Sequence, residues 1–237
     1  RKARRPQGGP LANIYLNEFD WEMHSRGVKT VRYADDIVVF AKSKRAAERL
    51  LESSRRYLEG KLKLKMNTEK SKVTSIFAVK EFKFLGFCIG RNGSGIYIRA
   101  HRKSLNKAKE KLKLLTKRNR GRNVRRVMAE VKVFIRGWLG YFHVAEMKRM
   151  MKSWDEWLRR RFRMYIWKQW KKPRTKVANL KKLGIPADKA YQWGNSRLSY
   201  WRIAGSPVLA CSITNERLAA AGYFSILNCY ESLHSCD

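Results

Sequence analysis

The stretch VKTVRYADDIVVF, residues 28–40, decides how the first part of the chain folds. β-Branched and aromatic residues fill both of its flanks, 28–33 and 37–40, which is typical of β-strands. Asp35 and Asp36 lie between the two flanks, so we expect both acids at the turn of a β-hairpin. Two adjacent carboxylates repel one another, and a divalent cation such as Mg²⁺ would relieve that repulsion. The alternative is an exposed Asp-Asp turn that binds no metal.

Helical and extended patterns surround this hairpin. Apolar residues recur at helical spacing over 11–23 and 47–58, and Ser43 is a suitable N-cap for the second helix. The glycine-rich segment 91–95 predicts the turn of a second hairpin. Strands are expected in three further segments: 61–66, 82–89 and 96–98. Together these elements predict an α+β fold for residues 1–100, with an antiparallel sheet and packed helices.

The pattern changes to helix after this first segment. Three amphipathic helices are predicted in residues 101–182, and their apolar stripes can bury one another in a small bundle. Residues 183–237 are expected to form a mainly helical extension. The bundle helices are expected over 104–120, 124–142 and 146–172, with Pro173 ending the last, and short helices of the extension at about 187–194 and 214–221.

The charge of the chain is large and unevenly distributed. Its 237 residues include 54 Lys and Arg against 19 Asp and Glu, a formal net charge of +35. Residues 101–182 contribute 28 cations and 5 acids, whereas residues 183–237 are neutral. With 44% hydrophobic residues, the chain is no disordered basic tail. The excess argues against a neutral metabolic enzyme and favours a polyanionic partner, nucleic acid before an anionic membrane surface.

Two dense basic clusters carry most of this excess. A solvated helix face is the usual reading of such charges, but in the first cluster Glu110 alone opposes eleven cations between 103 and 126. Self-repulsion on this scale favours contacts with RNA phosphates. We expect these contacts from Lys103, Lys107, Lys111, Arg118, Arg120, Arg122, Arg125, Arg126, Arg159, Arg160, Arg163, Lys168, Lys171 and Lys172.

The positions of tryptophan and cysteine indicate which residues pack in the core and argue against a metal or disulfide site. Helical periodicity places Trp138, Trp154 and Trp157 in the core. The four cysteines form no C-x-x-C pair, which favours free thiols over a zinc site or a disulfide framework. No apolar run approaches the roughly 18–20 residues that span a bilayer. Three further tryptophans lie beside Lys or Arg, leaving base stacking as an alternative to packing: Trp167, Trp170 and Trp201.

Beyond these patterns, the tetrapeptide YADD (33–36) on a hairpin is the signature of reverse transcriptases. Other segments in the same order resemble the group II intron-encoded reverse transcriptase/maturase family, so that the resemblance covers essentially the whole chain. They are PQGGPL (6–11), ANIYLN (12–17), FLGF (84–87), IRGW (135–138), IWKQW (166–170), LGIP (183–186), YWR (200–202) and SP (206–207).

The resemblance implies a partial reverse-transcriptase palm followed by an all-α thumb/maturase domain. It implies Mg²⁺-dependent, RNA-templated DNA synthesis from deoxynucleoside triphosphates, with Asp35 and Asp36 as catalytic metal ligands. It also implies binding of the parent intron RNA, which assists splicing and mobility, and of an RNA/DNA duplex, with a DNA target as a further candidate. Template or nucleotide contacts fall to Gln7, Gly8, Gly9, Pro10, Tyr33, Ala34 and Lys70, and the primer grip to Phe84, Leu85 and Gly86.

Two departures from the family pattern shape the expectations. The family's third catalytic Asp and its fingers belong upstream of the Gln-Gly-Gly segment, so we expect the 237-residue chain alone to be a poor or inactive polymerase. About four residues are also missing between Leu11 and Ala12, through either a deletion or a gap closed in the numbering. The alternative function is an RNA-binding splicing cofactor with a vestigial Asp35-Asp36. We expect a protein of a bacterial-type cytoplasm, or one that is otherwise intracellular with nucleic acid, without a membrane or small-molecule cofactor partner.

Overall fold

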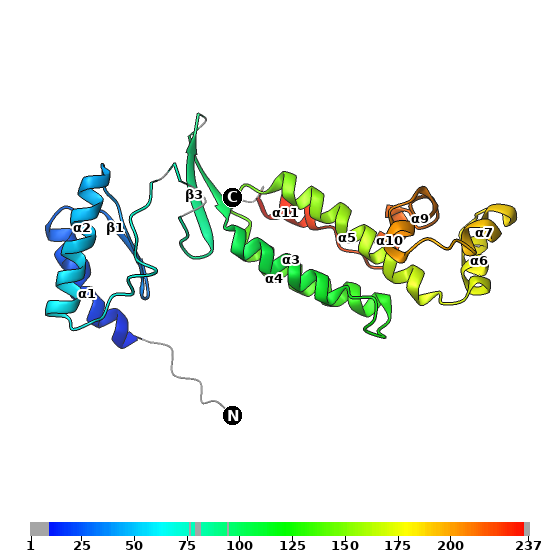
Figure 1. Ribbon diagram of the computed structural model, residues 1–237, viewed down its shortest axis with the longest axis horizontal. Helices are drawn as coiled ribbons and strands as arrows, with labels where there is room; N and C mark the ends of the chain where they lie inside the picture. Colours follow the sequence, from blue (N-terminus) through cyan, green and yellow to red (C-terminus); the bar gives the residue numbers. More distant parts are fainter. Residues whose placement is uncertain (1–9, 76, 79–81, 94, 235–237) are drawn as a thin grey trace, which may run out of the picture. The chain divides into compact units, whose positions relative to one another are not determined.

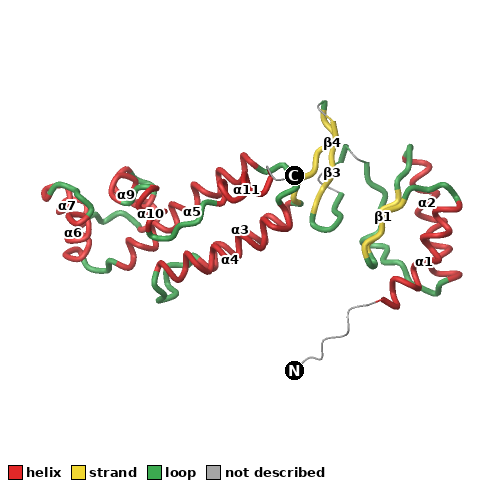
Figure 2. The backbone as a smooth tube through the Cα atoms, turned by 180° about the vertical axis from the view of Figure 1, so that it is seen from behind, coloured by secondary structure: helices red, strands yellow, loops and turns green. Residues whose placement is uncertain are grey.

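A computed structural model describes residues 10–75, 77–78, 82–93 and 95–234 (Figure 1). Helices dominate, and two small two-stranded sheets accompany them, which confirms the α+β class. Figure 2 shows the strands in yellow and the helices in red, and along the chain all strands precede the run of helices α3 to α11. The chain divides into two compact units, 1–97 and 98–237, and each is described by itself.

The first unit is built around the predicted hairpin. Its elements are α1 (Pro10–Ser25), β1 (Thr30–Tyr33), β2 (Asp36–Val39), α2 (Lys44–Arg56) and a single π-helical turn (Tyr57–Lys61). Strands β1 and β2 are antiparallel, and Tyr33 pairs with Asp36 at the turn. The predicted cap of α2 is confirmed, because the Ser43 hydroxyl accepts a hydrogen bond from the Ala46 amide at 3.2 Å.

Apolar side chains of α1 form the centre of this unit. Leu16, Phe19 and Met23 recur at helical spacing and are buried together with Leu58 and Leu62. Partly buried residues of the hairpin and of the following segment pack against this cluster: Val28, Ile37, Tyr57, Leu64 and Met66. The core therefore fixes one face of the β1–β2 hairpin against α1.

The strand predicted over 61–66 is wrong. Lys63 has a left-handed φ of 55°, and the Leu64 amide donates to the Leu58 carbonyl at 2.8 Å, so the segment closes the preceding helix instead of joining a sheet. The alternation of side chains is nevertheless real. Leu62 is buried and Met66 is half-buried, whereas Lys65 between them is exposed.

The strand predicted over 82–89 is interrupted. Phe84 and Phe87 exchange both backbone hydrogen bonds, at 3.0 and 2.8 Å, around a tight turn at Leu85 and Gly86. Both turn residues have positive φ, the conformation of a two-residue hairpin turn. Strand β3 therefore begins only at the turn's end and pairs with β4, as the second predicted hairpin requires: β3 (Phe87–Asn92) and β4 (Gly95–Ala100).

The second unit is entirely helical after its first residues. Long helices α3, α4 and α5 match the three predicted amphipathic segments, and α11 packs on α4 and α5. Shorter helices follow, with α6 packed on α7 and α8 packed on α5. The elements are α3 (Arg102–Leu115), α4 (Val124–Phe142), α5 (Lys148–Gln169), α6 (Pro173–Lys182), α7 (Ala187–Gly194), α8 (Tyr200–Ala204), α9 (Pro207–Ser212), α10 (Asn215–Ala220) and α11 (Ile226–His234).

The end of the third long helix differs from the prediction. Helix α5 stops at Gln169, and Pro173 begins α6 as its first helical residue instead of ending α5. Proline lacks only an amide that a helix start leaves unpaired, so it suits this position. Trp138 and Trp154 contact one another across α4 and α5, with ring centroids 5.7 Å apart. Of the three tryptophans predicted in the core, Trp154 is buried, whereas Trp138 and Trp157 are half-buried.

Candidate nucleic-acid interface

The YADD segment forms the tip of the β1–β2 hairpin, as predicted. Ala34 takes a left-handed φ of 55° in the two-residue turn, and Asp35 follows it. Asp36 is the first residue of β2 and lies opposite Tyr33, so the two side chains share a sheet face. Tyr33, Asp35 and Asp36 are all exposed, which leaves both carboxylates accessible to a ligand.

Arg32 anchors this turn from the opposite sheet face. Its guanidinium donates two hydrogen bonds to Asp20 Oδ2, at 2.8 and 2.6 Å, and further ones to Asn13 Oδ1 at 2.9 Å and the Ala34 carbonyl at 3.1 Å. Hydrogen bonding to Asp20 raises the pKa of Arg32, so the guanidinium stays charged. The side chain is only 14% exposed. One residue thus joins α1 to the backbone of the turn, and no pattern in the sequence signalled this role.

The donor set at the hairpin suits a hard divalent cation only in part. Asp35 and Asp36 offer carboxylate oxygens, and Mg²⁺ is commonly held by one or two carboxylates together with substrate phosphates. Among the residues that the structure describes, no three His, Cys, Asp or Glu side chains come together. An open depression of about 760 Å³ adjoins the turn, lined by Asn13, Ile14, Asn17, Arg32, Tyr33 and Ala34. The two acids therefore supply only part of the ligand set that a divalent cation would need.

Of the other predicted palm residues, Lys70 lies in one turn and Phe84, Leu85 and Gly86 lie in another. Gln7, Gly8 and Gly9 lie outside the described residues, and Pro10 is the first residue of α1. Lys70 is exposed in a turn whose shape is set by Asn67, because Asn67 Oδ1 accepts from the Lys70 amide at 3.1 Å. Phe84, Leu85 and Gly86 make the tight turn before β3.

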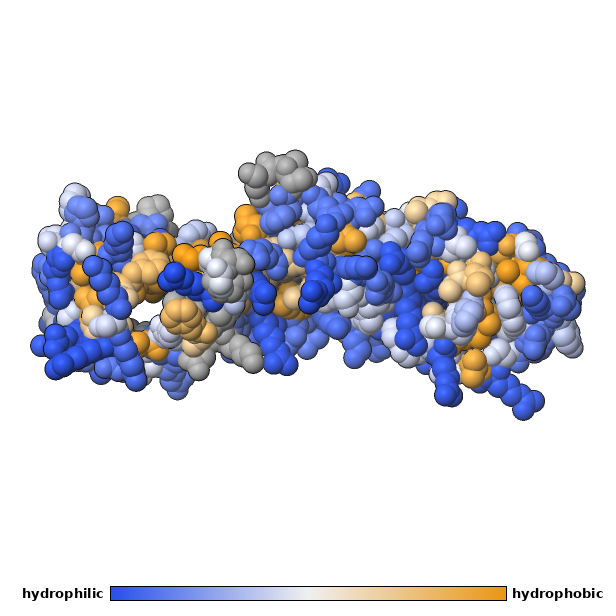
Figure 3. All heavy atoms as spheres, turned by 90° about the horizontal axis from the view of Figure 1, so that it is seen from above, coloured by the Kyte–Doolittle hydropathy of each residue, from blue (hydrophilic) through white to orange (hydrophobic). Residues whose placement is uncertain are grey.

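Helix α3 presents a row of lysines to solvent. Ala108 and Leu112 are buried at 3% and 1% exposure, and they fix which side of the helix faces the bundle. Lys103, Lys107 and Lys111 are spaced by four residues on one exposed side. Hydrophilic side chains cover much of the protein surface drawn in Figure 3. The row therefore offers three cations to a polyanion at helical spacing.

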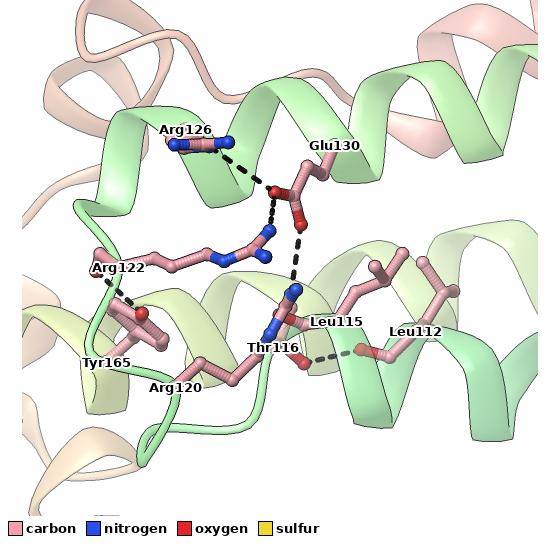
Figure 4. Close-up of polar contacts among 8 residues, drawn as sticks. All are labelled: Leu112, Leu115, Thr116, Arg120, Arg122, Arg126, Glu130 and Tyr165. Carbon is pink, nitrogen blue, oxygen red and sulfur yellow. Dashed lines mark hydrogen bonds and ion pairs between the residues drawn. The ribbon is translucent and has the colours of Figure 1, made fainter.

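Three arginines surround one acid where the turn after α3 leads into α4 (Figure 4). Glu130 of α4 accepts hydrogen bonds from Arg122 and from Arg120, the latter at 3.0 Å, and it forms an ion pair with Arg126 at 3.8 Å. Burial pushes the pKa of the Glu130 carboxyl upward, but the hydrogen bonds and charges of Arg120 and Arg122 together lower it. The four-residue spacing of Arg126 and Glu130 predicts an ion pair on one helix face, and the interpretation of these cations as RNA contacts did not use it.

The arginines of α5 are used inside the protein. Arg159 pairs with Asp155 at 2.6 Å, and Arg163 donates to the Ile213 carbonyl at 2.8 Å. Arg160 donates to the Trp201 carbonyl at 2.8 Å, and its guanidinium lies 4.1 Å from the centre of the Trp201 ring. Contacts of these three arginines with RNA stay a prediction, because the structure gives them a role in holding α5 to later segments.

Arg161 is the most enclosed of the α5 arginines, at 9% exposure. It donates to the hydroxyl of Thr116, to the Thr116 carbonyl at 3.2 Å and to the Lys113 carbonyl at 2.9 Å. The two carbonyls lie at the C-terminal end of α3, in its last turn and at its C-cap, so a cation caps the negative end of that helix. Burial lowers the pKa of Arg161.

The three tryptophans that were candidates for base stacking differ in their exposure to solvent. Trp167 is 1% exposed, which excludes it from stacking on bases, and Lys176 lies 4.6 Å from its ring centre. Trp170 is half-buried, 5.6 Å from the Trp167 ring. Trp201 is 37% exposed but one ring face is covered by Arg160. Of the remaining predicted cations, Lys171 and Lys172 are exposed and Lys168 is half-buried near Tyr200.

Asp155 is a buried acid that sequence reasoning passed over. It is 2% exposed and accepts hydrogen bonds from the Tyr223 hydroxyl at 2.7 Å, the Ser225 hydroxyl at 3.1 Å and the Ile226 amide at 2.8 Å. Burial, followed by the charge and hydrogen bond of Asp155, raises the pKa of Tyr223 far above its ordinary value. With Arg159 as counter-charge, Asp155 fixes the start of α11 on α5.

Comparisons with known proteins match the two units to two families. Residues 2–89 match the family reverse transcriptase (RNA-dependent DNA polymerase), and residues 105–184 match the group II intron, maturase-specific domain. The chain is similar to Protein YkfC of Escherichia coli (strain K12), with 32% identity over 127 residues that cover 38% of this chain and 33% of YkfC. It therefore spans about a third of the length of that curated relative. In the described part of the chain, no helix has the length and apolar character needed to cross a membrane.

Proposed function

Because the chain belongs to the group II intron reverse transcriptase/maturase family, we propose that its helical unit binds intron RNA through backbone phosphates. The exposed row Lys103, Lys107 and Lys111 on α3 carries this proposal. These lysines are exposed whereas Ala108 and Leu112 of the same helix are buried, and the segment around them has little negative charge to neutralise them. Phosphate contacts of this kind give affinity that depends strongly on salt and little on base sequence.

The hairpin of the first unit supports a second part of the proposal, RNA-templated DNA synthesis. Asp35 and Asp36 would hold Mg²⁺, which stabilises charge on the attacking and leaving oxygens of phosphoryl transfer. The chain's own contribution is to expose the two carboxylates on a rigid turn, which Arg32 ties to α1 through Asp20 and the Ala34 carbonyl. Adjacent residues of the family pattern, Tyr33 and Ala34, line the depression beside that turn.

Splicing assistance and DNA synthesis are separable consequences of this arrangement. The proposed RNA-binding row and the acidic turn lie in different units, so we expect RNA affinity to be independent of the acids. We expect Asp35→Ala to leave RNA affinity within about twofold, since it removes an exposed acid and one negative charge. If the chain acts as a polymerase together with the remainder of the palm, Asp35→Ala abolishes nucleotide incorporation. If it is a splicing cofactor with a vestigial site, the wild type already incorporates no nucleotides.

A salt series on intron RNA tests the main proposal. Filter binding of the 237-residue chain is expected to give a linear fall of log K with log salt concentration. In the triple variant Lys103→Gln, Lys107→Gln, Lys111→Gln, affinity should fall at least tenfold and the slope should drop by about 2 to 3. The charge-matched control is Lys42→Gln, Arg45→Gln, Arg49→Gln, three exposed cations beside and on α2.

The control variant separates a specific row from bulk charge. It is expected to lose much less affinity than the α3 triple variant, because it removes the same charge from another unit. Equal losses in the two variants would mean that the α3 lysines contribute to RNA affinity only through the overall positive charge of the protein. A wild-type affinity that ignores salt would remove the proposal altogether.

A further inference from the structure

The turn between α3 and α4 concentrates positive charge in a short segment. Residues 117–126 include six cations and no acid: Lys117, Arg118, Arg120, Arg122, Arg125 and Arg126. Like charges this close favour an extended chain that separates them. The segment is nevertheless compact, since Gly121 takes a φ of 66° and Asn123 caps α4 through its side chain. Something must offset the repulsion, and in Figure 4 the carboxylate at the centre is Glu130.

Glu130 fixes the arginine side chains, and separate contacts fix their backbone. Nη1 of Arg120 donates both to Glu130 and, at 2.8 Å, to the Leu115 carbonyl at the end of α3. The carbonyl of Arg122 accepts from the Tyr165 hydroxyl at 2.7 Å and from Gln169 at 2.8 Å, both on α5. The Arg120 guanidinium is thus held by Glu130 and by the Leu115 carbonyl, whereas Arg122 is held at its guanidinium by Glu130 and at its carbonyl by α5.

We propose that Glu130 is a positioning residue, which holds the guanidinium groups of Arg120 and Arg122 as a preformed site for one backbone phosphate of the RNA. The inference rests on the proposed RNA binding and adds to it a specific site. Each guanidinium has five N–H donors, and one carboxylate engages only a few of them. The side chains of Arg120 and Arg122 are 24% and 42% exposed, and the cluster with Arg126 keeps a net charge of +2.

The benefit of such a site is entropic as well as electrostatic. A free arginine on a flexible turn loses rotamer freedom when it binds a phosphate, whereas a guanidinium already held in place loses less. Paired arginines also suit the planar, charge-assisted hydrogen bonds that phosphate oxygens accept. Lysines on α3 supply charge to the RNA, and the α3–α4 turn supplies a fixed geometry.

The proposal and simple electrostatics predict opposite signs for one substitution. Glu130→Gln keeps the side-chain shape and raises the formal net charge by one. If Glu130 only reduced the positive field, this variant would bind RNA more tightly. If Glu130 positions the arginines, the variant binds more weakly although it is more positive.

RNA filter binding across a salt series decides between these outcomes, with Glu110→Gln as the matched control. Glu110 is an exposed acid on α3 with the same charge change. We expect Glu130→Gln to lose affinity about five- to tenfold and about one unit of salt slope. We expect Glu110→Gln to stay within about twofold of the wild type or to bind more tightly. Equal or tighter binding by Glu130→Gln overturns the inference.

A second comparison covers the case in which Glu130→Gln unfolds the turn. Circular dichroism melts give the melting temperature of each variant, and RNA binding is measured below that temperature, where the variant is folded. Arg122→Gln should then cost about five- to tenfold in affinity, whereas Arg102→Gln, an exposed arginine of the same unit with the same charge change, should cost about twofold. Equal losses at the two positions count against a preformed site. Wild-type RNA binding that fails altogether instead contradicts the proposed function.

Discussion

Helices α3 and α5 look alike in sequence, since each carries a dense set of cations beside an apolar stripe. In the structure they use those cations in opposite ways. The lysines of α3 lie in solvent, whereas Arg159, Arg160, Arg161 and Arg163 of α5 donate to acceptors within the protein. Arginine suits the second role, because its planar fork satisfies several carbonyl and carboxylate acceptors at once.

This difference shows that charge density alone overstates the number of cations available to RNA. A helix packed on one side needs polar groups only toward water, as in α3. Helix α5 is contacted by α4, α8 and α11, so most directions around it lead to protein. A cation there must find an acceptor or stay unpaired in a poorly solvated place. The α5 arginines therefore serve packing, and the α3 lysines are exposed for the proposed binding of RNA.

The largest expected effect comes from breaking the contacts that hold α11 to α5. Asp155→Ala removes the carboxylate that accepts from the Ile226 amide, the Ser225 hydroxyl and Arg159, and it leaves the Tyr223 hydroxyl only the longer bond to the backbone carbonyl at this position. We expect the free energy of unfolding to fall by about 3–5 kcal/mol, measured by urea denaturation. The control Glu156→Ala removes an exposed acid from the next position and should change stability by less than about 0.5 kcal/mol. Similar losses in both variants would contradict a buried anchor at Asp155.

A pair of methionine substitutions sharpens the contrast between the two helices. Arg161→Met removes three hydrogen bonds at the end of α3 while preserving side-chain volume, so unfolding should become easier by about 1.5–3 kcal/mol. RNA affinity of the folded protein should hardly change. Lys111→Met should do the reverse, with a stability change within about 0.5 kcal/mol and a loss of RNA affinity. The inward-outward distinction fails if both variants affect the same property.

The smallest expected effect is a pH dependence at the α3–α4 turn, where the two uses of cations meet. Because the folded pKa of Glu130 is lowered from its ordinary value of 4.5, its ionised form stabilises the fold above that pH. This contribution is lost as pH falls through the lowered pKa. The melting-temperature difference between the wild type and Glu130→Gln should therefore be constant near neutral pH and shrink below about pH 4.5. A difference that widens on acidification would reverse the assigned sign.

Much of the fold followed from local patterns. The YADD hairpin, the cap at Ser43 and the span of α4 were all predictable, because β-branched runs, capping residues and helical spacing act within a few neighbouring residues. The errors arose where distant or conformational factors decide. Alternation over 61–66 reported burial correctly, but a strand also needs a hydrogen-bonding partner. The turn at Leu85 and Gly86 lay inside an otherwise strand-like run.

The candidate site was predictable in its residue types and less so in its supports. Adjacent acids on a hairpin and lysines at helical spacing are visible in the sequence. Arg32, Asp155 and Arg161 were not recognised, because their partners lie on other elements. Glu130 falls between these cases, since its ion pair with Arg126 has helical spacing but its bonds to Arg120 and Arg122 depend on the turn. Tertiary contacts of single side chains leave no periodic signal.

The position of α11 has a consequence for how the protein is made. The Tyr230 hydroxyl donates to the Ala145 carbonyl at 2.8 Å and accepts from the Met147 amide at 3.1 Å, across 85 and 83 residues of sequence. Residues 223–226 complete the shell around Asp155 in the same way. On the ribosome, α4 and α5 emerge long before these partners are synthesised. The bundle therefore reaches its final packing only after Tyr230 has left the ribosome. Until then, the apolar side chains that α11 covers and the carboxylate of Asp155 remain exposed to water.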